Sequence, residues 1–198
     1  ASANDERQRQ GLPPFYRLLV LAEQPGAVAT SAGFQLVAEQ AWGETDPAQI
    51  DTLLIPGGLG EQAQCQNKPL LAWLGDAAPQ VRRLGSVCSG ALILAAAGLL
   101  DGRRATTHWA LAGQFRRRFP QVELQIEQLL CHDGNLLSSG GAQAGLDLCL
   151  YLIGQQAGAE LARQVANALV FDSQRGSQAR YAPLLPSQAV QDSQLATL

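Results

Sequence analysis

The stretch Gly85-Ser86-Val87-Cys88-Ser89-Gly90 decides the predicted fold. The apolar run at 84–87 predicts a short strand, and the Ala/Leu-rich run at 89–97 predicts a helix that Gly98 ends. A strand that turns directly into a helix, with a cysteine at the corner and small residues around it, has the pattern of a nucleophile elbow. The start of the helix favours a thiolate there and lowers its pKa. The alternative interpretation is a buried cysteine at a tight strand–helix turn.

Strands and helices alternate on both sides of this stretch. Short, uniformly apolar strands are typical of a parallel sheet covered on both faces, so the alternation predicts an α/β fold. Further strands are predicted at 15–22, 33–37 and 52–55, and a hairpin at 129–132 and 135–138 whose Asp133-Gly134 favours a type I′ turn. Further helices are predicted at 69–78, 108–119, 142–156 and 159–170.

The composition bounds the class of protein. The chain has 198 residues, of which 46% are apolar, so it can bury the core of one domain or two small ones and is not a disordered chain. Its 14 basic and 17 acidic residues give a net charge of −3, which lacks the electrostatic footprint of a nucleic-acid-binding domain. The sequence contains no methionine, so we expect a processed chain or a piece of a larger protein.

The cysteines and the apolar runs indicate a cytoplasmic protein. Residues 1–14 are polar and charged and do not form a signal peptide. The longest apolar run, 91–100, is about half as long as a membrane-spanning helix. Four widely spaced cysteines read as free thiols of a reducing compartment: Cys65, Cys88, Cys131 and Cys149. The two histidines lie far apart in the sequence, so we expect no metal site and no cofactor.

Two strand exits carry candidate ligand-binding residues, because ligands bind beyond the carboxyl ends of parallel strands. Gly57 and Gly58 follow the strand at 52–55, and the N–H of Gly58 is expected to complete an oxyanion hole with that of Ser89. Ser139 and Gly140 follow the strand at 135–138. The alternatives are an ordinary glycine-rich strand exit and a simple capped turn.

His108 and Trp109 form a third candidate pair, at the predicted start of a helix that Thr107 caps. A histidine at a helix start has a lowered pKa and offers a neutral hydrogen-bonding ring. The tryptophan ring offers a flat wall for a ligand or a face for a cation. The alternative for this pair is simple packing.

Four motifs together resemble a known family: IPGG at 55–58, SVCSGA at 86–91, AGLLDGRRATTHW at 97–109 and GGAQAGLDLCLYL at 140–152. They are similar to the class I glutamine amidotransferase-like domain of the ThiJ/PfpI superfamily, and most similar to the N-terminal domain of AraC-type transcriptional regulators of the GlxA group. The resemblance covers about residues 15–185. It implies a three-layer sandwich with a mainly parallel central sheet, as in flavodoxin-like folds.

The resemblance also implies a function and a division of the chain. Residues 15–171 would form a ligand-sensing and dimerisation domain for a small-molecule effector such as an amino acid or quaternary amine. Residues 172–198 would form an arm toward a helix-turn-helix domain, absent from this sequence, that alone contacts DNA. Residues 1–14 would be a remnant that lacks the family's first strand. The expected effector site comprises Gly57, Gly58, Cys88, Ser89, His108, Trp109, Ser139 and Gly140.

The alternative function is that of a cysteine-dependent hydrolase or an isonitrile hydratase, a branch that shares the 102–109 motif. Cys88 would then be the nucleophile and His108 would relay protons. Two departures from the family favour the non-catalytic sensor. The histidine that follows the nucleophile in the amidase and protease branches is Ser89 here, and the acidic partner of the family's first loop is missing.

Overall fold

A computed structural model describes residues 1–30, 33–172 and 175–179 of the chain. Its central sheet has four strands in the order β5 (Thr52–Ile55), β6 (Arg83–Val87), β10 (Leu136–Ser139) and β9 (Leu130–Asp133). The first three run parallel to one another, and β9 pairs with β10 in the antiparallel sense. The predicted mainly parallel sheet is therefore confirmed.

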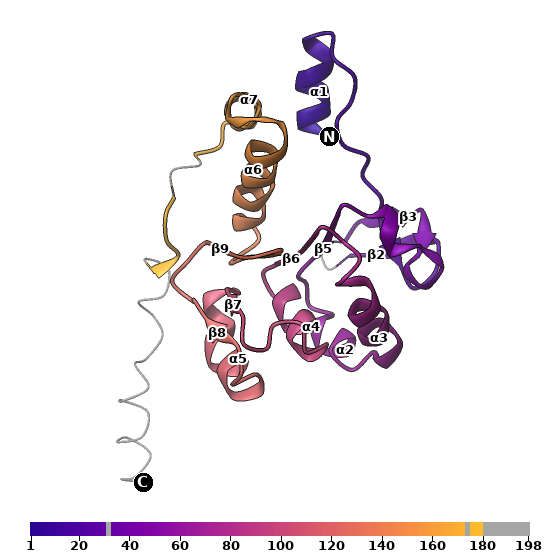
Figure 1. Ribbon diagram of the computed structural model, residues 1–198, viewed down its shortest axis with the longest axis vertical. Coiled ribbons are helices and arrows are strands. Elements are labelled where there is room, and N and C mark those ends of the chain that lie inside the picture. The colour runs from indigo at the N-terminus through magenta and orange to yellow at the C-terminus, as the bar shows by residue number, and fades with distance from the viewer. Residues whose placement is uncertain (31–32, 173–174, 180–198) are drawn as a thin grey trace.

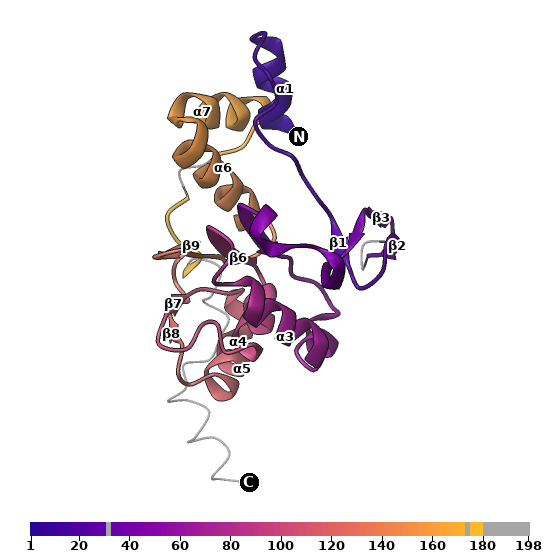
Figure 2. The same ribbon diagram turned by 45° about the vertical axis from the view of Figure 1, so that its right-hand side comes forward.

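Helices cover both faces of this sheet, which gives three layers (Figures 1 and 2). On one face lie α2 (Glu61–Gln64), α3 (Lys68–Ala77), α4 (Gly90–Ala96) and α5 (Ala112–Arg118). On the other face lies α6 (Ala144–Ala157), and α7 (Ala159–Ala168) and α1 (Ser2–Arg9) pack beyond it. Short 3₁₀ turns occur at Trp42–Glu44, Pro47–Gln49 and Trp109–Leu111. The predicted helices are confirmed, with boundaries that differ by a few residues.

The main core lies between the sheet and the layer of α3, α4 and α5. Leu74, Leu92, Leu94 and Phe115 are fully buried there, and apolar burial of this kind is the main force that holds the layers together. A smaller cluster on the opposite face joins Leu137 of β10 to Leu148 and Leu152 of α6. Strand β6 is therefore held between two packed layers, and its C-terminal end has a fixed position in the molecule.

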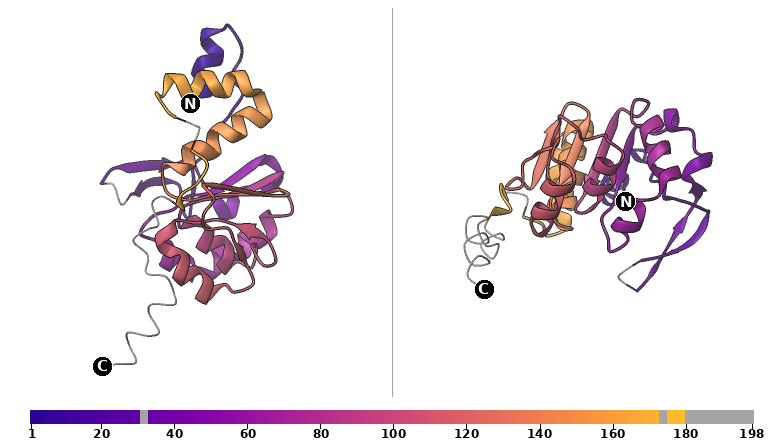
Figure 3. Two further views of the ribbon diagram at one scale, coloured as in Figure 1. Left: turned by 90° about the vertical axis from the view of Figure 1, so that its left-hand side faces the viewer. Right: turned by 90° about the horizontal axis from the view of Figure 1, so that it is seen from below.

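Three small two-stranded sheets lie outside the central one. They pair β1 (Leu21–Ala22) with β4 (Gln40–Ala41), β2 (Gly26–Ala29) with β3 (Gln35–Ala38), and β7 (Arg104–Ala105) with β8 (Glu123–Leu124). The predicted strand at 33–37 is thus the second arm of a hairpin, which projects from the body of the molecule (Figure 3, right).

The predicted strand at 15–22 is wrong for most of its length, because only Leu21 and Ala22 pair with another strand. Within the described residues β5 pairs only with β6, so no strand lies against its other edge. A strand forms only where a neighbouring strand pairs with its N–H and C=O groups. The backbone groups of Phe15 and Tyr16 bond the Asn4 side chain instead, and in the described part of the chain only the Val20 carbonyl bonds the β3–β4 segment, through the Glu39 N–H. Most side chains of residues 15–20 are exposed, with Leu18 at 65%, whereas Tyr16 and Leu19 are half-buried.

The predicted hairpin between β9 and β10 is confirmed, but its turn differs from the expectation. The φ angle is positive at Gly134, at +63°, and not at Asn135. A type I′ turn requires positive φ at both central residues, whereas a type II′ turn requires it only at the first. Because Asp133 pairs with Leu136, the two loop residues are Gly134 and Asn135 and not Asp133 and Gly134. Positive φ at the first of them alone is the pattern of type II′.

Candidate functional site

Cys88 occupies the corner between β6 and α4, with a φ angle of +55°. A non-glycine residue in the left-handed region is uncommon and costs about 1–3 kcal/mol, so such strain persists only where the surroundings enforce it. Here β6 ends at Val87 and α4 begins at Gly90, which leaves only two residues for the change of direction. The strained corner predicted from the sequence is present, and the Cys88 side chain is half-buried.

Two glycines make this corner possible. A Cβ atom on Gly90 would lie 2.3 Å from the carbonyl oxygen of Ile55, and one on Gly57 would lie 2.9 Å from the Cβ of Cys88. Neither the end of β5 nor the Cys88 corner can move away from such contacts, because β5 and β6 are hydrogen-bonded to each other. The exit of β5 and the start of α4 therefore approach as closely as glycine allows.

Gly58 does not offer its N–H to a ligand in this arrangement. The Gly58 N–H donates to the hydroxyl oxygen of Ser89 at 3.0 Å, and that hydroxyl donates to the Gly58 carbonyl at 3.2 Å. The Ser89 N–H instead points to the sulfur of Cys88. The oxyanion hole expected from the sequence thus lacks its Gly58 donor, because the adjacent serine side chain satisfies that group first.

Two further segments hold the corner from the other side. The Cys88 N–H donates to the carbonyl of Ser139 at 2.9 Å, and the Thr107 hydroxyl donates to the carbonyl of Cys88 at 2.8 Å. Thr107 therefore does not cap the following helical turn, contrary to the expectation. The His108 side chain does so, through its Nδ1 atom. The Ser139 hydroxyl is fully buried and faces Ser86, so Ser139 supports Cys88 through its backbone.

His108 is held in one orientation and one tautomer. The Ala110 N–H donates to Nδ1 of His108 at 3.2 Å, so in the neutral ring the hydrogen is carried by Nε2. Burial lowers the pKa of His108 below its usual value, which favours that neutral ring. The imidazole lies against the Trp109 ring with 5.3 Å between centroids, and its other edge faces Gly141. In this tautomer Nε2 donates a hydrogen bond to a ligand and does not act as the acceptor of a thiol proton.

The electrostatic surroundings of Cys88 do not activate its sulfur. Burial raises the pKa of the Cys88 thiol, the Ser89 N–H lowers it, and the Glu61 carboxylate raises it again, for a net increase. Glu61 begins α2 and was not singled out in the sequence. The structure records no hydrogen bond between Cys88 and His108 among the residues that it describes. A thiol with a raised pKa that bonds no histidine stays mostly protonated at neutral pH.

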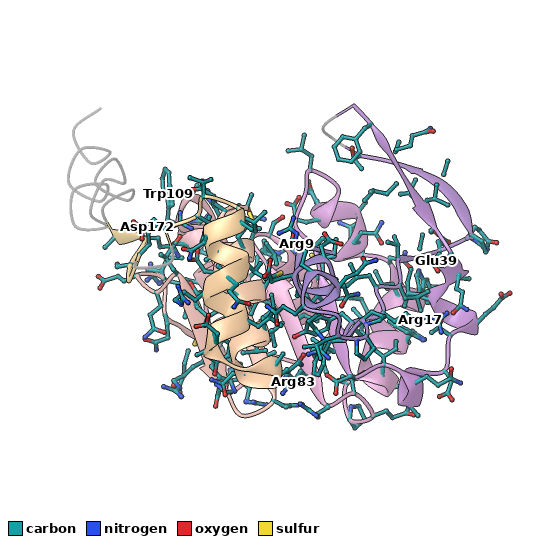
Figure 4. The ribbon with its side chains drawn as sticks, turned by 90° about the horizontal axis from the view of Figure 1, so that it is seen from above. Arg9, Arg17, Glu39, Arg83, Trp109 and Asp172 are labelled. Atoms are coloured by element: carbon teal, nitrogen blue, oxygen red, sulfur yellow. The ribbon has the colours of Figure 1, made fainter. Side chains whose placement is uncertain are left out.

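The site residues predicted from the sequence lie at the carboxyl ends of β5, β6 and β10. Gly57, Gly58, Cys88 and Ser89 meet directly, and Ser139 and Thr107 connect them to Gly140 and His108. Trp109 lies on the same side of the molecule as Asp172 and opposite Glu39 (Figure 4). Two hollows of about 710 and 340 Å³ lie elsewhere, one against α6 and α7 and one near Arg82 and His132.

Comparisons with known proteins agree with this fold. The model of the DJ-1/PfpI family matches residues 16–155. The chain belongs to the DJ-1/PfpI family. The fold of a ThiJ/PfpI family protein from Pseudomonas syringae is similar, with a TM-score of 0.69 and 26% identity over 91% of this chain and 74% of that one. An AraC family transcriptional regulator from Pseudomonas putida gives a TM-score of 0.65 at 23% identity, over 85% and 86% of the two chains.

Curated relatives of this DJ-1/PfpI chain include proteins of two classes that bear on its function. One is the isonitrile hydratase of Pseudomonas putida, 35% identical over 70% of this chain and 58% of the relative. The other comprises HTH-type transcriptional regulators of Pseudomonas aeruginosa: GbdR is 32% identical over 83% of this chain and 44% of the relative, and CdhR is 35% identical over 79% and 45%. The chain thus spans about half the length of the curated relatives that it matches.

Gln178 lies next to the candidate site of this DJ-1/PfpI chain, and nothing in the sequence singles it out. Its side chain is only 2% exposed, and a Cβ atom on Gly140 would lie 2.7 Å from its Oε1 atom. The residue belongs to a polar segment that predicts a solvated arm, so only the folded structure reveals that it is buried. Glu61 had a weak signal, as an acidic residue three positions after Gly58 at a predicted strand exit.

The pH dependence of Cys88 alkylation tests the electrostatics of this DJ-1/PfpI elbow. Because the thiol pKa is raised, the rate of reaction with iodoacetamide should rise about tenfold per pH unit from about pH 7 to 8.5 without levelling off. A Cys149→Ser background removes the exposed thiol, and mass spectrometry follows the labelling of Cys88. A rate that is already constant above pH 7 would mean an activated thiolate and would contradict the assignment.

No described helix has the length and apolar character needed to cross a membrane.

Proposed function

We propose that the chain is the ligand-sensing and dimerisation domain of a bacterial AraC-family transcription regulator. Its effector is a small metabolite bound at the Cys88 elbow, and DNA is contacted by a further domain of the protein. The observation that carries the proposal is the geometry of the elbow: no hydrogen bond joins Cys88 to His108 among the described residues, and the Nδ1 of His108 already accepts from the Ala110 N–H. Burial raises the pKa of the Cys88 thiol as well. Such a site can bind a ligand but lacks the base that nucleophilic attack requires.

The similarity to regulators supports this proposal in a second way. GbdR and CdhR match 83% and 79% of this chain but are more than twice as long as the matched part, since only 44% and 45% of each is covered. The remainder of such a protein is long enough for a DNA-binding domain. Residues 15–171 would then be the sensor, and the residues from 172 onward its arm.

The chemistry of the elbow favours a small zwitterion, such as an amino acid or a quaternary amine that carries a carboxylate. The Trp109 ring offers a face for the cationic group, and the Glu61 carboxylate places negative charge near Cys88. The Nε2–H of His108 is a donor suited to the carboxylate. Groups suited to a cation and a group suited to a carboxylate are thus both found near the carboxyl ends of these strands.

A cysteine-dependent hydratase is the second candidate. The strained elbow favours it, and so does the 35% identity of the chain to an isonitrile hydratase. In that reaction the Cys88 sulfur would attack the isonitrile carbon, and a base would have to accept the thiol proton. His108 does not serve as that base in the observed tautomer, because its Nε2 already carries a hydrogen. The sensor therefore agrees better with the site.

A ligand panel tests the proposal. The chain is heated with each of the twenty amino acids, with choline and with glycine betaine, and its melting temperature is recorded. We expect at least one compound to raise the melting temperature in proportion to the logarithm of its concentration, in the chain and equally in Cys88→Ser. Stabilisation by none of these compounds, together with turnover of an isonitrile that Cys88→Ser abolishes, would favour the hydratase instead.

A further inference from the structure

The segment that leaves the sensing domain is anchored by a side chain placed directly behind the elbow. Gln178 is 98% buried by its neighbours, with 2% exposure, although it lies in a polar segment at the end of the described chain. Its Nε2 atom lies 2.6 Å from the carbonyl of Ile126, 2.9 Å from that of Thr107 and 3.2 Å from that of Gln128. The Thr106 hydroxyl lies 3.2 Å away as well. The side chain therefore joins two separate segments of the domain to the arm.

The backbone of the arm is attached at the same place. The Gln178 N–H and the Ser177 hydroxyl both donate to the carbonyl of Glu127, and Ser177 forms an isolated antiparallel bridge with Gln128. Figure 1 shows this short yellow segment at the end of β9, next to β7. Earlier in the arm, Arg175 forms an ion pair with Asp147 of α6 at 2.6 Å. A release at Gln178 would consequently leave the start of the arm in place.

Thr107 touches both the elbow and the arm. Its hydroxyl donates to the carbonyl of Cys88 at 2.8 Å, and its carbonyl accepts from Gln178 at 2.9 Å. The proposed ligand-binding side chains, His108 and Trp109, follow it directly in the chain. A movement of residues 107–109 around a ligand therefore changes the geometry at Gln178 without any intermediate residue.

The docked arrangement of Gln178 is incompletely satisfied. Its two Nε2 hydrogens face four acceptors, and its buried Oε1 atom has no hydrogen-bond partner. A buried acceptor without a donor raises the free energy of the docked state, and release into water would hydrate it. Docked and released arms are therefore two discrete states whose balance a small displacement of Thr107 can shift.

We propose that Gln178 is the latch through which occupancy of the Cys88 elbow controls the arm. An occupant at the elbow displaces Thr107, weakens the four contacts of Gln178 and releases residues 177–179, and release of the arm in turn opens the elbow. This inference rests on the proposed sensing function, since it names how that site would be regulated. The latch itself is a property of this chain and can be measured without any effector.

The rate of Cys88 alkylation by iodoacetamide reports the first half of this coupling, which is the effect of a released arm on access to the elbow. In the Cys149→Ser background, Gln178→Ala and Gln178→Glu should each label at least about threefold faster at Cys88 than the parent. The glutamate variant has the same size and places a carboxylate among carbonyl oxygens, so it should release the arm most. Gln80→Ala is the control, because Gln80 is an exposed glutamine whose side chain donates to the carbonyl of Asp76 and bonds no residue of the arm. Its labelling rate should equal that of the parent.

Hydrogen–deuterium exchange reports the second half of the coupling, which is the effect of an occupied elbow on the arm. With Cys88 capped by iodoacetamide, the amides of Gln178 and Ala179 should exchange at least about threefold faster than in the uncapped chain. Melting temperatures within a few degrees of the parent show that the variants are folded. Equal labelling rates in the parent and both Gln178 variants would overturn the latch while leaving ligand binding intact. Equal exchange rates of the Gln178 and Ala179 amides in the capped and uncapped chains would do the same. Failure of the ligand panel would overturn the sensor and leave these rates unaffected.

Discussion

Replacing Gly90 by alanine should destabilise the chain by about 3 kcal/mol, because the new methyl group would lie 2.3 Å from the carbonyl oxygen of Ile55. The carbonyl of Pro56 is also near, at 2.8 Å, so a shift away from one backbone atom meets another. Urea denaturation at constant slope measures the loss of free energy of unfolding. The corner at Cys88 depends on this contact, so the exposure of its thiol should increase as well.

Gly75→Ala is the control for that experiment. Gly75 lies within α3, and no atom comes within 4 Å of a Cβ placed there. Alanine at an open helical position should stabilise the chain by about 0.5–1 kcal/mol, through lower entropy of the unfolded state. If Gly90→Ala were as stable as the parent, the close approach of β5 and α4 would be wrong, and the elbow with it.

Replacing Trp109 by alanine should weaken effector binding by about tenfold or more, because the ring supplies the face on which the cationic group would rest. Trp109→Phe keeps an aromatic face of smaller area and should lose about threefold. Isothermal titration with the compound that most raises the melting temperature measures both affinities. Tyr151→Phe is a suitable control, since Tyr151 bonds His132 at the other end of the sheet. Unchanged affinity in Trp109→Ala would place the effector elsewhere.

The arrangement of the sheet could be predicted from the sequence because its strands are short apolar runs that glycine and proline end. The same reasoning failed at residues 15–20, which have the apolar character of a strand. Apolarity predicts that a segment can pair, whereas pairing itself depends on a neighbour that only the three-dimensional arrangement supplies. The turn at Gly134 differed for a related reason, since register decides which two residues form the loop.

At the site, the sequence predicted which segments converge but not which atoms are free. Gly58 was expected to present its N–H, yet the Ser89 hydroxyl occupies it, and Thr107 binds Cys88 instead of capping a helix. These pairings depend on side-chain rotamers across 31 and 19 residues of sequence, which no local pattern encodes. Gln178 was hidden for the opposite reason, because polar residues are usually exposed and its burial comes from contacts 50 to 72 residues away.

The most direct test of the account is the fate of a bound compound. The chain and its Cys88→Ser variant are each mixed with the stabilising compound from the panel and followed by proton NMR over several hours. The account predicts broadened ligand signals in both samples and no new signals in either, as for a protein that binds without conversion. Product signals that appear with the parent and are absent with Cys88→Ser would contradict it and assign Cys88 a catalytic role.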